Sequence, residues 1–142
     1  MKIEGRHTVP APQETVWQRL NDPSVLERSL PGVERLEPDG PDRYRASIKY
    51  KVGAVSGSFS GSVELSEKNP PHSMRLKTSA RGVPGFVTGE GKLELVPKGA
   101  ETEVVYSGEL QLGGLLAAIG SRMVESAAKK SIEDFFKSLA SS

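Results

Sequence analysis

Residues 55–65 read Val-Ser-Gly-Ser-Phe-Ser-Gly-Ser-Val-Glu-Leu, and this stretch decides the predicted fold. Apolar or small residues alternate with serine or glutamate, which is the period of a strand with one buried face. Gly57 and Gly61 fall in the buried phase, together with Phe59 and Val63. The stretch therefore predicts a long strand whose buried face carries little side-chain volume.

Six further segments show the same alternation, at residues 2–9, 33–37, 44–52, 74–81, 87–95 and 102–112. Turn residues such as Asn69-Pro70-Pro71 separate them. Short connections and one polar phase favour a single antiparallel sheet with one solvated face. Two short helical patterns, one with Val16-Trp17 and one with Val25-Leu26, lie between the first and second strands.

The period changes after Gly113-Gly114, and residues 115–139 predict one long helix with an apolar stripe. Its stripe comprises Leu116, Ile119, Met123, Ala127, Ile132, Phe135, Phe136 and Leu139. No other element is long enough to cover the apolar face of the sheet. We predict an α+β fold in which a seven-stranded antiparallel sheet curves around the long C-terminal helix, with two short helices between strands 1 and 2, as a single domain over residues 1–142.

The composition excludes several classes of protein. The 19 Lys and Arg residues nearly balance the 18 Asp and Glu residues, so no large basic field exists for a nucleic-acid backbone. Cysteine is absent, and His7 and His72 have no metal-ligand spacing, so we expect no metal site. The chain begins without an apolar leader and has no run near the roughly 18 apolar residues of a membrane span. We expect a cytoplasmic protein.

Glycines recur in the buried phase of the strands, at Gly57, Gly61, Gly89, Gly91 and Gly108. One interpretation is that they let strands coil and approach the helix closely. The other is that they leave a hollow, which is unfavourable unless a ligand fills it. We predict an apolar cavity for a hydrophobic small molecule. Its expected lining is Ile48, Tyr50, Phe59, Val63, Val87, Leu93, Tyr106, Leu110, Ile119, Met123 and Ala127.

Every second turn of an antiparallel meander lies at the same end, and three such segments combine glycine with apolar residues. We expect them to form a portal, made of Gly53, Val55, Val83, Pro84, Phe86, Leu115 and Leu116. The portal would admit the ligand or dock on a membrane or protein surface, with Arg81 and Arg122 attracting anionic headgroups. The alternative is that these side chains pack under the end of the helix.

Catalytic groups are scarce on the predicted inner face. The carboxylates of the strands fall in the polar phase, and the strand serines face outward without a histidine nearby in sequence. His7 is a lone histidine in an apolar phase. We therefore predict a binding protein rather than an enzyme. Two alternatives stay open: a docking module with a filled core, and a cyclase- or hydrolase-type enzyme that uses Tyr50, Tyr106 or His7.

Motifs along nearly the whole chain point to one family. They are Met1-Lys2-Ile3-Glu4-Gly5, Val9-Pro10-Ala11-Pro12, Val16-Trp17, Asn21-Asp22-Pro23, Leu30-Pro31-Gly32, Lys51-Val52-Gly53, Gly57, Gly61, Pro84-Gly85-Phe86, Gly113-Gly114, Gly120-Ser121-Arg122 and Ala127-Ala128-Lys129-Lys130. Together they resemble the family of the carbon monoxide dehydrogenase G subunit, which belongs to the START-like, birch-pollen-allergen-like helix-grip superfamily.

The resemblance implies a central cavity of the kind that binds lipids, sterols, hormones or polyketides in that superfamily, with the loops around Gly53 and Pro84 as gate and latch. The family is linked with aerobic molybdenum-containing CO dehydrogenases and related hydroxylases, with membrane attachment, and with electron transfer to quinones. The resemblance therefore implies a carrier of a quinone or lipid that needs no covalent cofactor, works with such a hydroxylase, and contacts the inner face of the membrane peripherally.

Overall fold

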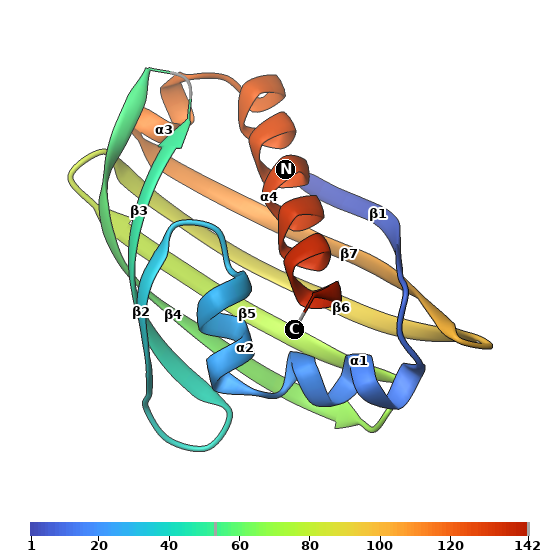
Figure 1. Cartoon of the computed structure of the whole chain (residues 1–142). Helices are drawn as coiled ribbons and strands as arrows, with labels where there is room; N and C mark the ends of the chain where they lie inside the picture. Colours follow the sequence, from blue (N-terminus) through green and yellow to red (C-terminus); the bar gives the residue numbers. More distant parts are fainter. Residues whose placement is uncertain (53, 142) are drawn as a thin grey trace.

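The computed structural model describes residues 1–52 and 54–141, and of Val52 only the backbone. Its seven strands form one antiparallel sheet in the order β1-β7-β6-β5-β4-β3-β2 (Figure 1). The strands are β1 (Lys2–Val9), β2 (Val33–Pro38), β3 (Arg43–Val52), β4 (Val55–Asn69), β5 (Ser73–Gly82), β6 (Gly85–Lys98) and β7 (Glu101–Gly114).

Two short helices, α1 (Gln13–Leu20) and α2 (Pro23–Ser29), follow β1, and α4 (Ser121–Ala140) crosses one face of the curved sheet (Figure 1). The Asp22 carboxylate accepts a hydrogen bond from the backbone N–H of Ser24, and Pro23 opens α2. An acidic cap followed by proline suits a helix start, where the first N–H groups lack partners. The predicted fold, a seven-stranded antiparallel sheet around a long C-terminal helix, is confirmed.

The prediction of one continuous helix over residues 115–139 is wrong at its start. The segment divides into α3 (Leu115–Ala118) and α4, because Gly120 adopts a positive φ of 95° between them. A right-handed helix cannot continue through that conformation, which glycine adopts without a steric penalty. The apolar residues before and after Gly120 therefore do not lie on one face of a single helix.

The hydrophobic core lies where α1, α2 and the C-terminal half of α4 meet the sheet. Its most deeply buried apolar side chains are Val9, Val16, Leu20, Met74, Val104, Phe136 and Leu139. Arg19 of α1 donates hydrogen bonds to the carbonyls of Leu139 and Ala140, at the C-terminus of α4. These bonds satisfy carbonyls that the helix itself leaves unpaired. The C-terminal end of α4 is thus tied to α1 and to the core.

Three inward glycines lie where neighbouring strands come unusually close. A Cβ atom would lie 2.5 Å from the carbonyl oxygen of Ser79 at Gly61, 2.7 Å from that of Ser107 at Gly91 and 2.6 Å from that of Glu90 at Gly108. Real Cβ atoms essentially never approach so near. At these positions the absent side chain allows the sheet to coil tightly, as the first of the two interpretations predicts.

Substitution of Gly61 by alanine tests this role. The added methyl group has to displace the backbone of β5, so we expect Gly61→Ala to lower the free energy of unfolding by about 1–3 kcal/mol. The measurement is urea unfolding followed by circular dichroism. Ser60→Ala, on the exposed face of the same strand, is the control and should change the stability by less than about 0.5 kcal/mol. Equal stability of both variants would contradict the assigned role of Gly61.

Candidate binding cavity

Two adjoining hollows separate the sheet from its helices. The larger has a volume of about 420 Å³ and is bordered by the sheet, α2 and the C-terminal half of α4. The smaller has a volume of about 210 Å³ and is bordered by the sheet, α3 and the N-terminal half of α4. Together they reach the size of ordinary small-molecule sites.

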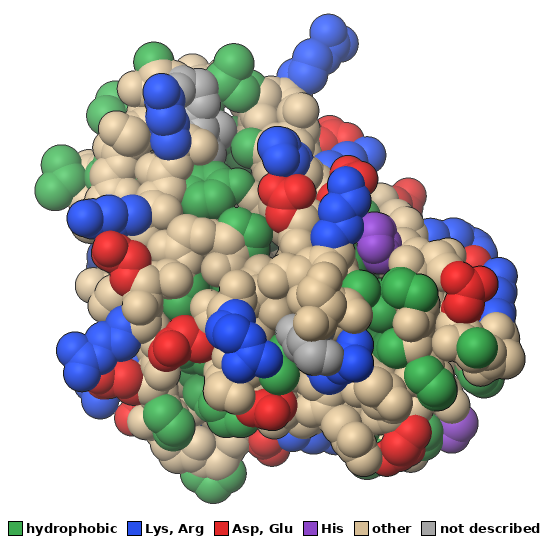
Figure 2. Space-filling view, viewed as in Figure 1, with side chains coloured by type: hydrophobic (Ala, Val, Ile, Leu, Met, Phe, Trp, Pro, Cys, Tyr) green, Lys and Arg blue, Asp and Glu red, His purple; other side chains and the backbone are tan. Residues whose placement is uncertain are grey.

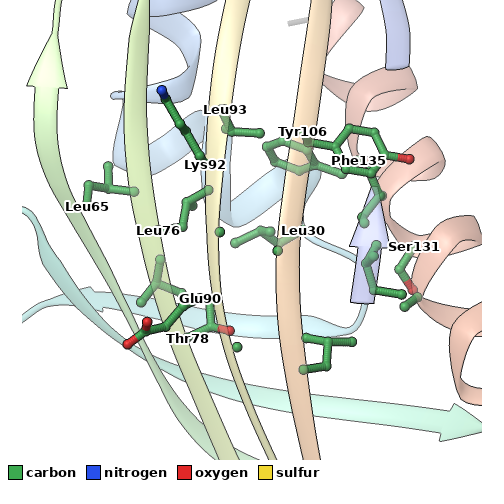
Figure 3. Close-up of a pocket in the computed structure, with 18 of the residues that line it drawn as sticks. Leu30, Leu65, Leu76, Thr78, Glu90, Lys92, Leu93, Tyr106, Ser131 and Phe135 are labelled. Carbon is green, nitrogen blue, oxygen red and sulfur yellow. The ribbon is translucent and has the colours of Figure 1, made fainter. Parts of the chain in front are cut away.

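The register of the strands explains the position of the larger hollow. Inward residues of neighbouring strands form rows across the sheet, and two of these rows contain the glycines of β6 and β7. The rows are Ile3, Gly108, Gly91, Leu76 and Leu65, and then Leu110, Gly89, Thr78, Val63 and Tyr44. Because these glycines have no side chain, space remains between this part of the sheet and α4. The wall opposite includes Leu30 and Phe135 (Figure 3). Leu26 of α2 and Ile132 and Phe136 of α4 also line it.

The larger hollow offers hydroxyl groups but no inward charge among the described residues. Its polar side chains in the inward phase are Tyr44, Thr78, Tyr106 and Ser131. Glu90, Lys92 and Glu109 also border it, but they alternate with inward residues and are exposed. Their charges pair on the outer surface, for example between Lys77 and Glu90 at 3.5 Å. A neutral apolar molecule fits this lining, because a buried unpaired charge is strongly disfavoured.

Aromatic rings close the β1 side of the cavity. The Phe136 ring lies 6.2 Å from the Tyr106 ring and stacks on His7 at 5.5 Å between centroids. His7 therefore contacts the core through its ring and does not border either hollow. The lone histidine singled out in the sequence is a packing residue in this structure.

The smaller hollow continues the larger one toward α3. It is lined by Ile48, Tyr50, Val55, Phe59, Ala80, Val87, Leu110, Leu112, Leu116, Val124, Ala127, Ala128 and Ser131. Val87, Leu110, Ala128 and Ser131 border both hollows, so the two spaces meet at these side chains. At this junction the hydroxyl groups of Tyr50 and Ser131 form a hydrogen bond between β3 and α4.

The structure brings most of the predicted lining residues to the two hollows. Ile48, Tyr50, Phe59 and Ala127 border the smaller, Val63, Leu93 and Tyr106 the larger, and Val87 and Leu110 both. Ile119 and Met123 border neither, and Met123 is 48% exposed. The reason is the break at Gly120, which takes both residues out of the phase of a continuous helix. Whether the lining residues bind a ligand stays a prediction.

The predicted cavity-forming glycines divide into two groups. Gly89, Gly91 and Gly108 border the larger hollow. Gly57 and Gly61 border neither hollow. At Gly57 a Cβ would lie 2.6 Å from the Pro84 ring, so this glycine accommodates the turn between β5 and β6. The prediction that these two glycines add volume to the cavity is therefore wrong.

Two of the three predicted portal segments lie side by side at one end of the sheet. Gly85 pairs with both Gly82 and Gly114, which places the β5–β6 turn beside the start of α3. Val83 is fully exposed, and Leu115 and Phe86 are 59% and 38% exposed. In contrast, Pro84 and Leu116 are buried and Val55 is half-buried, as the alternative interpretation expected. Gly53 lies outside the described residues.

Sequence reasoning missed several parts of the lining, and two of them matter most for the site. One is the wall made by Leu20, Leu26, Leu30 and Pro31, because the sequence indicated two short helices there but not that they face the cavity. Another is Ser131, four residues after Ala127 on the apolar face of α4. A hydroxyl on an apolar stripe was the available signal, since a polar group in that position requires a partner.

Metal-binding clusters and membrane-spanning helices are absent from the described part of the chain. Residues 1–52 and 54–141 contain no cluster of His, Asp and Glu that could hold a metal ion. None of the helices in these same ranges is long and apolar enough to span a bilayer.

Comparison with known proteins adds the family context. The model of the family described as the G subunit of carbon monoxide dehydrogenase (CoxG) matches residues 5–142. A conserved protein from Geobacillus kaustophilus has 34% sequence identity and a TM-score of 0.95, over 99% of this chain and 93% of that one. Comparison with curated proteins gave no match.

Two solved structures of lower identity share the fold. One is a START superfamily protein from Mycobacterium smegmatis, with 16% identity and a TM-score of 0.70 over 99% of this chain and 94% of that one. The other is the Zhui aromatase/cyclase from Streptomyces sp. R1128, with 15% identity and a TM-score of 0.71 over 99% and 92%.

Tyr44, on the wall of the larger hollow, provides a test of burial by titration. Burial raises the pKa of its phenol above the ordinary value, and the nearby carboxylates of Asp42 and Asp22 raise this pKa further. Because the folded-state pKa is the higher one, Tyr44 contributes stability below about pH 10 that is lost as the pH rises through the folded-state pKa.

We expect Tyr44→Phe to remove a late step from the phenolate absorbance titration and to lessen the loss of stability above about pH 10. Tyr106→Phe is the matched control and should leave that late step in place. If Tyr44→Phe removed only an ordinary step and left the late step in place, the Tyr44 phenol would be open to solvent.

Proposed function

The chain belongs to the CoxG family, named for the G subunit of carbon monoxide dehydrogenase, and on this premise we propose that it is a non-enzymatic carrier of a hydrophobic small molecule, a quinone or a lipid. The observation that carries the proposal is the pair of adjoining hollows between sheet and α4, with a combined lining of apolar side chains and a few hydroxyls. An unfilled apolar space of this size destabilises a fold, whereas a bound molecule restores the lost packing contacts.

The lining favours binding over catalysis. In the described part of the chain, the inward side chains of the two hollows include no carboxylate and no histidine that could act as general acid or base. Hydroxyl groups without an activating base are weak nucleophiles. The likeness to an aromatase/cyclase concerns the fold alone.

The proposed carrier moves its ligand between a partner dehydrogenase and the membrane. The family name supports a link with CO dehydrogenase, and we extend the proposal to a molybdenum hydroxylase of this kind. Membrane contact is supported by a surface that we call the rim, made of exposed apolar residues and basic residues. The rim comprises Val83, Phe86, Leu115 and Met123 together with Lys51, Arg81 and Arg122.

The charges of the rim differ from those of the remaining surface. Most Lys and Arg side chains of the described residues have a carboxylate partner, as Lys49 has in Glu34 at 3.7 Å. Lys51, Arg81 and Arg122 form no ion pair within the described ranges, and residues 49–63, 78–89 and 110–124 contain no Asp or Glu. Figure 2 shows hydrophobic and basic side chains over α3 and the ends of β3 and β4. Such a surface matches anionic lipid headgroups above an apolar interior.

Ligand binding can be tested at the junction of the hollows. We expect the fluorescence of phenyl-naphthylamine to rise when it binds the delipidated wild type at micromolar concentration. Ala128→Leu should weaken this binding about tenfold or more, because the larger side chain fills space that both hollows share. Ser126→Leu adds the same side chain at an exposed position of α4 and should bind like the wild type.

Two outcomes would contradict the carrier. Absence of probe binding to the wild type, together with no extractable apolar molecule in native mass spectrometry, would favour a docking module with an empty or filled core. Capture of the partner dehydrogenase that is unaffected by Ala128→Leu would then support that second function.

Membrane contact has a separate test. The variant Lys51→Gln/Arg81→Gln/Arg122→Gln should bind phosphatidylglycerol vesicles about a hundredfold more weakly than the wild type, at about 1 kcal/mol per basic residue. The control Lys77→Gln/Lys92→Gln/Lys98→Gln removes the same charge from the outer face of the sheet and should retain binding. Flotation with anionic and neutral vesicles measures both. Equal loss in both variants would show that net charge, and not the rim, attracts the membrane.

A further inference from the structure

The junction between the two hollows contains an isolated pair of hydroxyl groups. Tyr50 projects from β3 and Ser131 from α4, and their hydroxyls form a hydrogen bond across the space between sheet and helix. Tyr50 borders the smaller hollow, and Ser131 borders both hollows together with Val87, Leu110 and Ala128, which are all apolar. The pair is therefore the polar feature of an otherwise apolar passage.

This pair keeps one hydrogen-bond donor in reserve. When one hydroxyl donates to the other, the accepting hydroxyl still has its own hydrogen, and both oxygens retain lone pairs. No other hydrogen bond of Tyr50 or Ser131 side chains occurs among the described residues. A donor in an apolar passage gains most from an oxygen acceptor that enters with the ligand.

We propose that Tyr50 and Ser131 together recognise a carbonyl-type oxygen of the bound molecule, which places one apolar arm in each hollow. The inference rests on the proposed function, since it concerns the same cavity, and it adds the chemistry and the orientation of the ligand. The class is a neutral ketone, quinone or ester with apolar groups on both sides of the oxygen. A carboxylate is disfavoured, because no inward cation borders the junction in the described residues.

Because the two hollows differ in size, we expect the two apolar arms of the ligand to differ in size as well. The smaller is bordered by Val55, Leu116 and Val124, beside the rim, and its volume of about 210 Å³ suits a slender chain. The larger, at about 420 Å³, lies deeper against α2 and is bordered by Leu26 and Leu30. A molecule that enters past the rim brings its wide end through the junction first and leaves its chain in the smaller hollow.

The ketone dyes prodan and laurdan test the recognition of the oxygen. Both carry the same naphthyl ketone, and their emission shifts to longer wavelength when the carbonyl accepts a hydrogen bond. The double variant Tyr50→Phe/Ser131→Ala removes both hydroxyls, so we expect a blue shift of bound prodan and an affinity lower by about three- to tenfold. Each single variant still offers the ligand one donor, as the wild-type pair does, so its prodan emission should stay close to that of the wild type.

Matched controls separate this effect from general damage to the cavity. Thr78→Val removes a hydroxyl from the larger hollow away from the junction and should leave the prodan emission unchanged. Phenyl-naphthylamine has no carbonyl, so its affinity for the double variant should equal that for the wild type. Equal thermal stability of the variants would establish that each is folded.

Laurdan tests the orientation, because its long acyl chain replaces the short chain of prodan. We expect the wild type to bind laurdan more tightly than prodan, and Ala128→Leu to remove this advantage by obstructing the junction.

The outcomes distinguish this inference from the proposed function. If phenyl-naphthylamine binds while the double variant leaves prodan emission and affinity unchanged, recognition by Tyr50 and Ser131 is overturned and the carrier stands. If neither dye nor phenyl-naphthylamine binds the wild type, the proposed function fails and this inference fails with it.

Discussion

The close approach of strands at the inward glycines is the constraint on which the cavity depends. Gly91 and Gly108 face each other across β6 and β7, and a Cβ atom on either would meet the backbone of the other strand. The strands can approach in this way only because both residues lack side chains. The same absence leaves the inner face of β6 and β7 bare toward α4, so one pair of residues accounts for both the curvature and part of the hollow.

The two ends of the long helix differ in how they are held. The C-terminal end of α4 packs with Phe136 and Leu139 into the core and accepts hydrogen bonds from Arg19. The N-terminal end follows the break at Gly120 and borders the smaller hollow through Val124. The packed core side chains and the Arg19 hydrogen bonds supply stability that offsets the unfilled space of the two hollows. This arrangement lets a small domain keep a cavity and remain folded.

Polar chemistry is distributed in the same uneven way. Most charged side chains pair on the outer face of the sheet, whereas the cavity contains hydroxyls and the rim contains cations without carboxylate partners among the described residues. Each arrangement follows from solvation: charges remain where water stabilises them, and neutral donors are tolerated inside if they find acceptors. The hydrogen bond between Tyr50 and Ser131 gives each of these inward hydroxyls a partner, and it lies where the two hollows meet.

Local pattern was sufficient to predict the strands, their inward phase and the presence of a covering helix. Alternation in residues 55–65 and the helical period after Gly114 depend on neighbours in the chain, which is why most of the predicted lining residues lie at the cavity. Only the tertiary structure decided that Gly89 borders a hollow while Gly61 contacts β5, that Met123 is exposed, and that Tyr50 meets Ser131. These outcomes depend on distances between segments far apart in sequence and on the backbone conformation of Gly120, and neither is encoded in the periodicity of a single segment.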